Sequence, residues 1–210
     1  MKVRVQTKEE LRKIIKQELK KQGRDADLNF IDTSLITDMS ELFYKLNVGN
    51  IKIDGWDVSN VEDMAYMFYD RWALDVDISG WDVSRVITME KMFSSCKKFN
   101  CDLSKWNVSR VENMTGMFEG CWKFTSDLSN WNISRVTNTF AMFSSCYRFN
   151  SDLSNWDTSK ITDMRSMFSS CKDLDCDLSE WDISSFKYTD KICYKSPHMT
   201  KDKLPKIKAK

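Results

Sequence analysis

The sequence has little of what many enzymes need: 210 residues include one histidine, six glycines and two prolines. The single histidine, His198, lies near the C-terminal end, so the central part of the chain cannot form a Cys–His or Ser–His–Asp arrangement. The glycines are scattered and build no phosphate-binding loop. We therefore predict that the protein is not an enzyme and that it binds no cofactor and no metal.

Long apolar runs are also missing. No stretch approaches the ~20 consecutive apolar residues that a membrane-spanning helix requires. The first residues are basic but lack the apolar core of a signal peptide, and no lipid-attachment pattern follows. The seven cysteines are an odd number, which fits a reducing compartment better than a complete disulfide framework. We expect a cytoplasmic protein that does not insert into a membrane.

The formal charge of +1 hides a separation of charges along the chain. Residues 1–24 hold nine Lys or Arg against three Glu, and residues 185–210 hold eight Lys against two Asp. The residues between them hold 15 basic and 26 acidic side chains, a net charge of −11. Because nucleic-acid backbones bind to concentrated basic surfaces, we expect no nucleic-acid contact except through the basic termini.

Tryptophan recurs every 25 residues through most of the chain. The recurring positions are Trp56, Trp81, Trp106, Trp131, Trp156 and Trp181. With Trp as position 1, the unit reads W-[DN]-x-S-x-[VI]-x-x-M-x-x-M-F-x-x-C-x-x-F-x-x-D-L-S-x, and residues 31–55 fit the same frame with Ile31 in the Trp place. Repeats of this length predict stacked coils that bury a continuous core.

Two patterns within the unit predict its local structure. Apolar residues at positions 6, 9, 12, 13, 16 and 19 share one face if the segment is helical. Positions 21 and 23 face one way and the Asp at position 22 faces the other, as in a short strand. We expect a right-handed α/β solenoid of about seven such coils, with a short parallel strand and a short helix or helical turn in each.

The repeat divides the chain into three parts. Residues 1–30 form an N-terminal cap with an amphipathic helix, for which Thr7 and Glu10 supply a capping-box pair and Gly23 a stop. Residues 31–180 form the repeat solenoid. Residues 181–210 form a degenerate last repeat and a basic tail that we expect to fray.

The phrase WDVSxVxxMxxMFxxCxxFNxDLSxW, which fits residues 31 to about 190, resembles the repeat of BspA-type leucine-rich-repeat proteins. It is similar to the 25-residue form found in mycoplasma surface lipoproteins. The resemblance implies a leucine-rich-repeat-like solenoid that binds other proteins, often at cell surfaces. The chain departs from that pattern by lacking an export signal and a lipobox, so we expect an intracellular or virus-encoded member.

Cysteine occupies position 16 of four successive units. These residues are Cys96, Cys121, Cys146 and Cys171. Equivalent residues of stacked coils lie in a row about 5 Å apart, whereas zinc gathers its four sulfurs at about 2.3 Å. We predict a buried thiol ladder that forms the core together with the Trp row, although neighbouring rungs are close enough for disulfides. The Asp row at position 22 offers either turn hydrogen bonds or a calcium site.

Positions where the repeat varies are the candidates for binding, because stacking does not dictate them. Large aromatic residues at solvent-facing edges are typical anchors of protein interfaces. We predict one patch formed by Tyr44, Tyr66, Tyr69 and Trp72, a second formed by Trp122 with Tyr147, and an outward Phe140 in the aberrant phrase TNTFAMF. The alternative is that these rings pack on long neighbouring side chains.

Together these features predict a non-catalytic scaffold that binds a partner protein through variable aromatic and charged rows. A phage- or virus-encoded inhibitor or decoy of a host complex is one form of this function, and we expect a monomer. The alternative, from a different class, is a structural component of a virion or of a cell-surface assembly.

Overall fold

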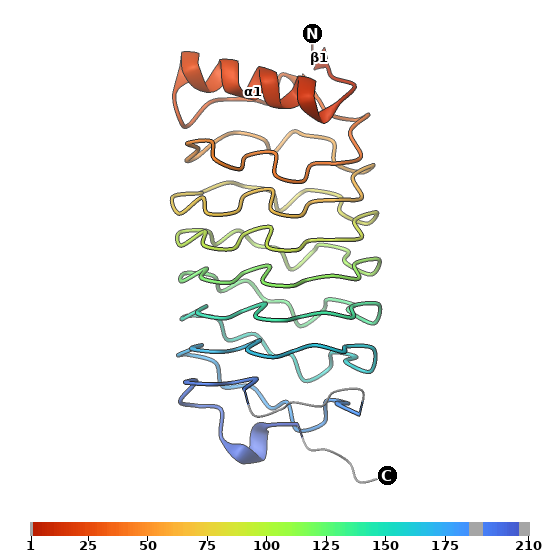
Figure 1. Ribbon diagram of the computed structural model, residues 1–210, viewed down its shortest axis with the longest axis vertical. Coiled ribbons are helices and arrows are strands. Elements are labelled where there is room, and N and C mark those ends of the chain that lie inside the picture. Colours follow the sequence, from red (N-terminus) through yellow and green to blue (C-terminus); the bar gives the residue numbers. More distant parts are fainter. Residues whose placement is uncertain (1, 185–190, 206–210) are drawn as a thin grey trace.

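The computed structural model describes residues 2–184 and 191–205, which form successive loops of chain stacked along one axis (Figure 1). The regular elements are β1 (Val3–Arg4), α1 (Lys8–Gln22), β2 (Ile31–Asp32) and the 3-10 helix η1 (Lys201–Lys203). Strands β1 and β2 pair in parallel, with Val3 opposite Ile31. We call each 25-residue loop that starts at position 1 of the repeat a layer. The predicted part 181–210 includes residues 185–190 and 206–210, which lie outside the described residues.

The predicted leucine-rich-repeat-like α/β solenoid is wrong. Apart from α1, β1, β2 and η1, the described residues contain turns and single bridging residues, so the layers lack the expected helix and strand. The reason is the hydrogen-bonding pattern of the backbone amides at positions 11 to 16. In the layer from Trp81, the amide of Met92 donates within its own turn to Met89, whereas the amide of Phe93 donates to Met117 of the next layer. In a helix both amides would donate to carbonyls of the same segment, and no backbone hydrogen bond would join this segment to the next layer.

Two left-handed residues in each of the six layers from Ile31 to Trp156 prevent the helix directly. Positions 11 and 15 have positive φ in successive layers. The residues are Glu41, Lys45, Tyr66, Asp70, Lys91, Ser95, Gly116, Gly120, Ala141, Ser145, Ser166 and Ser170. Left-handed residues interrupt a right-handed helix, so the segment becomes a series of tight turns.

The predicted strand at positions 21 to 23 is also replaced by a turn. The carboxylate of Asp102 accepts from the amide of Ser104, and the amide of Trp106 donates to the carbonyl of Leu103. Apart from one bridge at position 22, between Asp27 and Lys52, isolated parallel bridging among the described residues occurs at position 8, one residue in each of six layers. The bridged series is Asp38, Asp63, Thr88, Asn113, Asn138 and Asp163. A single bridging residue in each layer is too short to count as a strand.

Asx-turns account for most of the Asp and Asn residues that the repeat fixes. Side-chain oxygens at positions 2, 8 and 22 accept from the amide two residues later, as with Asp82 and Ser84 or Asn113 and Thr115. The expected Asx-turn at position 2 recurs from Asp57 to Asp182. The Asp row at position 22 therefore has backbone donors as partners.

These turns predict loss of stability in acid. Hydrogen bonds from the serine two residues later hold the pKa of Asp77, Asp102, Asp127 and Asp152 below its usual value. A carboxyl with a lowered folded-state pKa stabilises the fold above its unfolded-state pKa, and this contribution disappears as the pH falls through the folded-state pKa. The urea midpoint should therefore stay constant down to about pH 5 and fall below about pH 4. Urea titrations across this range test the prediction, and an unchanged midpoint at the acid end would contradict it.

The core consists of side-chain ladders that run from layer to layer. Phe68, Phe93, Phe118 and Phe143 are fully buried and stack on one another with ring centroids 5.6–5.7 Å apart. The repeated tryptophans are buried beside them, and each indole N–H donates to the carbonyl 28 residues earlier, one layer up. The bonds run from Trp56, Trp81, Trp106, Trp131, Trp156 and Trp181 to Leu28, Ile53, Ile78, Leu103, Leu128 and Leu153 at 2.9–3.2 Å.

The cysteine row forms a second ladder of the same kind. The thiols of Cys96, Cys121, Cys146 and Cys171 donate to the carbonyls of Phe68, Phe93, Phe118 and Phe143 at 2.9–3.1 Å. In the last layer Ser196 takes the cysteine place, donating to Phe168 and accepting from the amide of Cys171. All seven cysteines are free thiols. Tryptophan and cysteine thus recur at the same repeat positions because the side chain of each donates a hydrogen bond to the preceding layer.

Replacing Trp106 by phenylalanine tests the indole ladder. The change keeps an aromatic ring but removes one of the two donors to the carbonyl of Ile78, which retains the amide of Trp81. We expect a loss of about 2 kcal/mol, from one hydrogen bond and from the smaller ring. Urea unfolding at equilibrium measures it, with the exposed Trp122→Phe as control. Equal midpoints for the two variants would contradict a structural role for the indole N–H.

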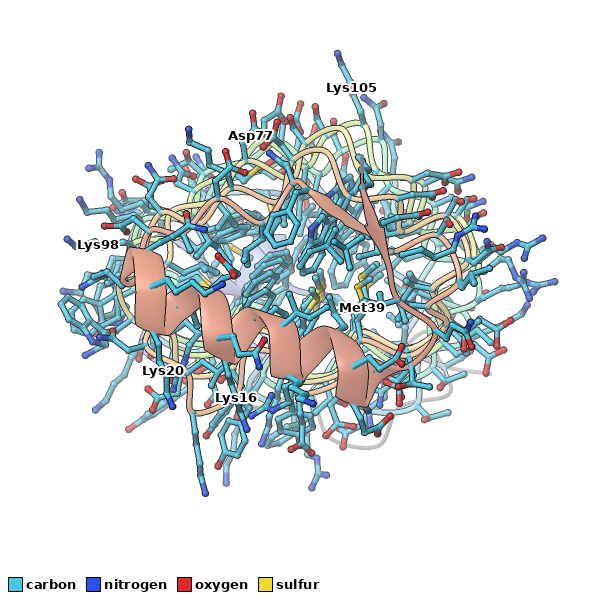
Figure 2. The ribbon with its side chains drawn as sticks, turned by 90° about the horizontal axis from the view of Figure 1, so that it is seen from above. Lys16, Lys20, Met39, Asp77, Lys98 and Lys105 are labelled. Atoms are coloured by element: carbon cyan, nitrogen blue, oxygen red, sulfur yellow. The ribbon has the colours of Figure 1, made fainter. Side chains whose placement is uncertain are left out.

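Helix α1 lies across the N-terminal end of the stack, and Figure 2 shows it over an interior that includes Met39. Thr7 is its N-cap and accepts from the amide of Glu10, and the amide of Gly23 closes the other end on Leu19. Leu11 and Ile15 are fully buried against the core. The amphipathic helix expected in residues 1–30 therefore corresponds to α1. Its position places the apolar face of the helix over the end of the stack.

Candidate partner-binding surface

The aromatic residues at variable positions differ in exposure. Trp72 is 57% exposed, Trp122 40% and Phe140 38%, which makes them exceptions among large apolar side chains. Tyr44, Tyr66, Tyr69 and Tyr147 are half-buried. The repeated Trp and Cys residues, by contrast, lie inside. Core and variable positions therefore separate in space.

Position 17 forms a column on the outside of the stack, which we call the aromatic column: Lys97, Trp122, Tyr147 and Lys172. The rings of Trp122 and Tyr147 stack with centroids 5.6 Å apart. The ammonium of Lys97 lies 4.3 Å from the Trp122 ring centroid, and that of Lys172 lies 4.6 Å from the Tyr147 centroid. Both outer ring faces are thus covered by a cation, and the ring edges remain towards solvent.

Trp72, at the same position two layers above Trp122, contacts the ammonium of Lys98 at 5.7 Å. The sequence prediction grouped Trp72 with three tyrosines. Among the ring contacts of the described residues, Trp72 joins none of these tyrosines. It lines instead a hollow of about 270 Å³ with Leu46, Val48 and Arg71. The grouping of Trp72 with the tyrosines in one binding patch stays a prediction.

The three tyrosines form a cluster near the N-terminal end, which we call the tyrosine cluster: Tyr44, Tyr66 and Tyr69. Tyr69 lies between the others, with centroids 5.9 Å from Tyr44 and 5.6 Å from Tyr66. With Glu41 they line a hollow of about 250 Å³. The hydroxyl of Tyr66 donates to Glu90 at 2.7 Å, and this bond raises the pKa of Tyr66 to about 12. Tyr66 is therefore held in place.

Phe140 faces outward, and the guanidinium of Arg165 in the next layer lies 5.5 Å from its ring. Its neighbour Thr139 replaces the usual methionine and is fully buried, with its hydroxyl donating to the carbonyl of Asp163. The layer keeps its place in the stack because this hydroxyl finds a partner.

The sequence analysis missed the cations that cover these rings. Lys97 and Lys172 occupy the same repeat position as Trp122 and Tyr147, so the 25-residue register was a signal that they are neighbours. Tyr194, 57% exposed with Lys195 over its ring, was also missed because the last repeat is degenerate. Several rings do pack on long side chains, as the alternative interpretation expected, yet Trp72, Trp122 and Phe140 remain exposed.

Three properties of the described residues bear on function: the protonation of the ladder thiols, metal binding and the length of the helices. Burial raises the pKa of the ladder thiols, to about 12 for Cys96, which keeps them protonated at neutral pH. Within residues 2–184 and 191–205, no group of three or more His, Cys, Asp or Glu side chains is placed to hold a metal ion. The same residues include no helix with the length and apolar character needed to span a bilayer.

Comparison with known proteins gives one family. The family model described as "Mycoplasma protein of unknown function, DUF285" matches residues 12–125 and again residues 102–206. Two matches along one chain agree with the internal repeat, and together they cover most of its length. No curated protein and no solved structure matches.

Proposed function

The chain belongs to the DUF285 family of Mycoplasma proteins, and we propose that it is a non-catalytic scaffold that binds a partner protein through its exposed aromatic residues. The observation that supports the proposal most is the aromatic column. The rings of Trp122 and Tyr147 stack outside the core, and none of the side-chain hydrogen bonds found among the described residues depends on them. Rigid aromatic anchors on a fixed frame are typical of protein interfaces.

The frame suits this role because its layers hold the anchors at a constant spacing. Indole and thiol donors tie each layer to the previous one, so side chains at position 17 lie one layer apart. The lysines over the rings hold them in fixed orientations before a partner arrives, which lowers the entropy lost on binding. Trp72 extends the same row towards the N-terminal end.

The sequence resemblance to BspA-type repeat proteins supports a binding role, because it implies proteins that bind other proteins. The free thiols fit a reducing compartment, and we propose that this member acts in the cytoplasm. A phage- or virus-encoded inhibitor or decoy of a host complex is the form of the function that we propose. The buried, protonated cysteines support a non-catalytic role, since a nucleophilic cysteine needs an accessible thiolate.

Affinity capture from the cells that contain the protein tests the proposal. The tagged wild type is compared with Trp122→Ala/Tyr147→Ala and with a control, Arg135→Ala/Lys160→Ala, which removes two exposed cations at position 5. We expect one protein or complex to be retained by wild type and control and lost by the aromatic variant. Equal retention by all three would refute binding through the aromatic column. Recovery of the chain alone, with a multimer in light scattering, would favour a structural component of an assembly.

A further inference from the structure

Helix α1 carries an excess of positive charge that the fold does not neutralise. Lys8 pairs with Asp38 at 2.5 Å and Lys21 pairs with Glu18 at 2.6 Å. Among the ion pairs of the described residues, none involves Lys13, Lys16 or Lys20. Three ammonium groups of α1 are therefore available to an external anion.

Arg12 adds a fourth cation without a carboxylate partner. Its guanidinium donates to three backbone carbonyls of the first layer, those of Glu41, Leu42 and Tyr44. These carbonyls fix the side chain but leave its charge unbalanced. Because Tyr44 belongs to the tyrosine cluster, Arg12 also joins α1 to one of the predicted partner-binding patches.

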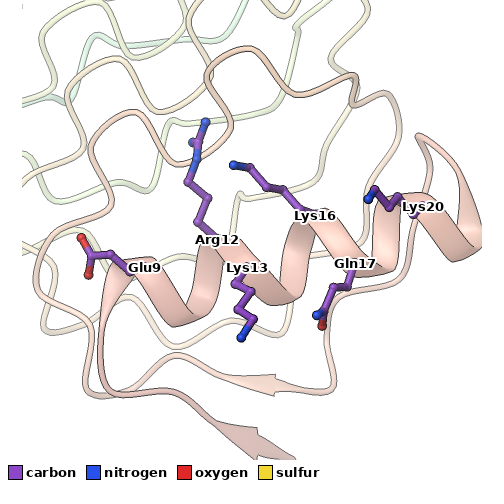
Figure 3. A pocket seen from close by; sticks show the side chains of 6 residues that line it. All are labelled: Glu9, Arg12, Lys13, Lys16, Gln17 and Lys20. Atoms are coloured by element: carbon purple, nitrogen blue, oxygen red, sulfur yellow. The ribbon is translucent and has the colours of Figure 1, made fainter.

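The unpaired cations lie along one hollow of about 380 Å³. Its lining residues are Glu9, Arg12, Lys13, Lys16, Gln17 and Lys20, which we call the α1 basic face. Figure 3 shows Arg12, Lys16 and Lys20 along one side of the helix and Lys13 with Gln17 on the other. Four cations against one carboxylate give this face a local charge of +3.

The charge and its spacing point to one kind of occupant. We propose that the α1 basic face binds an extended acidic segment of the partner protein, an inference that rests on the proposed function and names the chemistry of the partner. Residues four apart on a helix are separated by about 6 Å along its axis. Acidic residues at every second position of an extended segment lie about 6.8 Å apart, close to the spacing of Arg12, Lys16 and Lys20.

Other anionic occupants fit less well. A membrane-surface helix places large apolar side chains in the interface, whereas Leu11 and Ile15 of α1 are buried in the protein. A nucleic acid longer than the helix would run over layers whose residues carry a net charge of −11. A short acidic protein segment meets neither obstacle.

The test uses the full-length protein and a fluorescein-labelled peptide in which glutamate alternates with serine. Its counterpart carries glutamine in place of every glutamate. Fluorescence anisotropy measures both affinities for the wild type, for Lys16→Gln/Lys20→Gln and for a control, Lys105→Gln/Lys123→Gln, which removes two exposed lysines of other layers. Thermal melting establishes that each variant is folded.

We expect the acidic peptide to bind and its affinity to fall about tenfold, or about 1.4 kcal/mol, in Lys16→Gln/Lys20→Gln, since two exposed ion pairs with the peptide are lost. The control should retain its affinity and the glutamine peptide should not bind. Equal losses in both double variants, or no binding of the acidic peptide, would overturn the inference.

Two further arms use a single-stranded oligonucleotide and vesicles that contain phosphatidylserine. Tighter binding of either ligand through Lys16 and Lys20 would overturn the inference in favour of that ligand. Dimerisation of the wild type that Lys16→Gln/Lys20→Gln abolishes would assign the face to a second copy of the chain. Because purified protein and peptide suffice, failure here leaves the capture result for Trp122 and Tyr147 unaffected.

Discussion

Replacing Phe118 by alanine should cost about 3–5 kcal/mol of unfolding free energy, a large part of the about 5–15 kcal/mol by which folded proteins are stable. Phe118 is fully buried and stacks on Phe93 and Phe143 of the adjacent layers at 5.7 and 5.6 Å, and on Phe124 at 4.2 Å. Its removal leaves a cavity that the layers cannot close, because their backbone hydrogen bonds fix the distance between them. Urea unfolding followed by tryptophan fluorescence measures the loss.

Trp122→Ala is the matched control for this prediction, since it removes a larger ring from the same layer but from the outside. We expect it to cost about 1 kcal/mol, for the contacts with Lys97 and Tyr147. Similar losses for Phe118→Ala and Trp122→Ala would contradict the division between a structural core and a binding surface.

Replacing Ile15 by alanine should cost about 2–4 kcal/mol. Ile15 is fully buried on the face of α1 that packs against the core, and the end of the stack depends on this cover. Lys16→Ala, one residue further along, removes an exposed side chain and should leave the midpoint almost unchanged. Thermal and urea unfolding of the two variants test the prediction. A small effect of Ile15→Ala would mean that α1 only rests on the stack without stabilising it.

The sequence reveals the repeat and its buried positions but not the local backbone. Apolar residues three apart occur both on a helix face and in consecutive turns, so the spacing of Met89, Met92 and Phe93 did not distinguish the two. The backbone pattern decided the outcome, with amides bonded alternately within a turn and to the next layer. The helix and the strand of each unit were predicted from periodicity, and the resemblance to BspA-type repeats implied their leucine-rich-repeat-like arrangement; periodicity carries no information on the sign of φ.

One signal of that backbone was present in the sequence. Gly116 and Gly120 occupy positions 11 and 15 of their layer, and both have positive φ. Glycine at two positions of a predicted helix interior indicates left-handed turns rather than a helix. The other layers place Glu, Lys, Tyr, Asp, Ser or Ala at these two positions, which hid the pattern.

The candidate site was predictable only in part. Repeat register separates Trp81 in the core from Trp72 outside, because position 1 is Trp in six units whereas the residue at position 17 varies from unit to unit. Repeat register makes Lys97 and Lys172 neighbours of Trp122 and Tyr147, but only the stacking geometry shows that their ammonium groups lie over the ring faces. Ser196 as the last rung of the thiol ladder follows from counting 25 residues beyond Cys171.

The affinity of the captured partner for Trp122→Ala/Tyr147→Ala tests the central claim most directly. With both proteins purified, titration calorimetry compares this variant with wild type and with Arg135→Ala/Lys160→Ala. We predict a loss of about 2 kcal/mol or more, roughly thirtyfold in Kd, for the aromatic variant and no change for the control. An unchanged Kd for a folded aromatic variant would contradict the account and leave the aromatic column as a part of the frame.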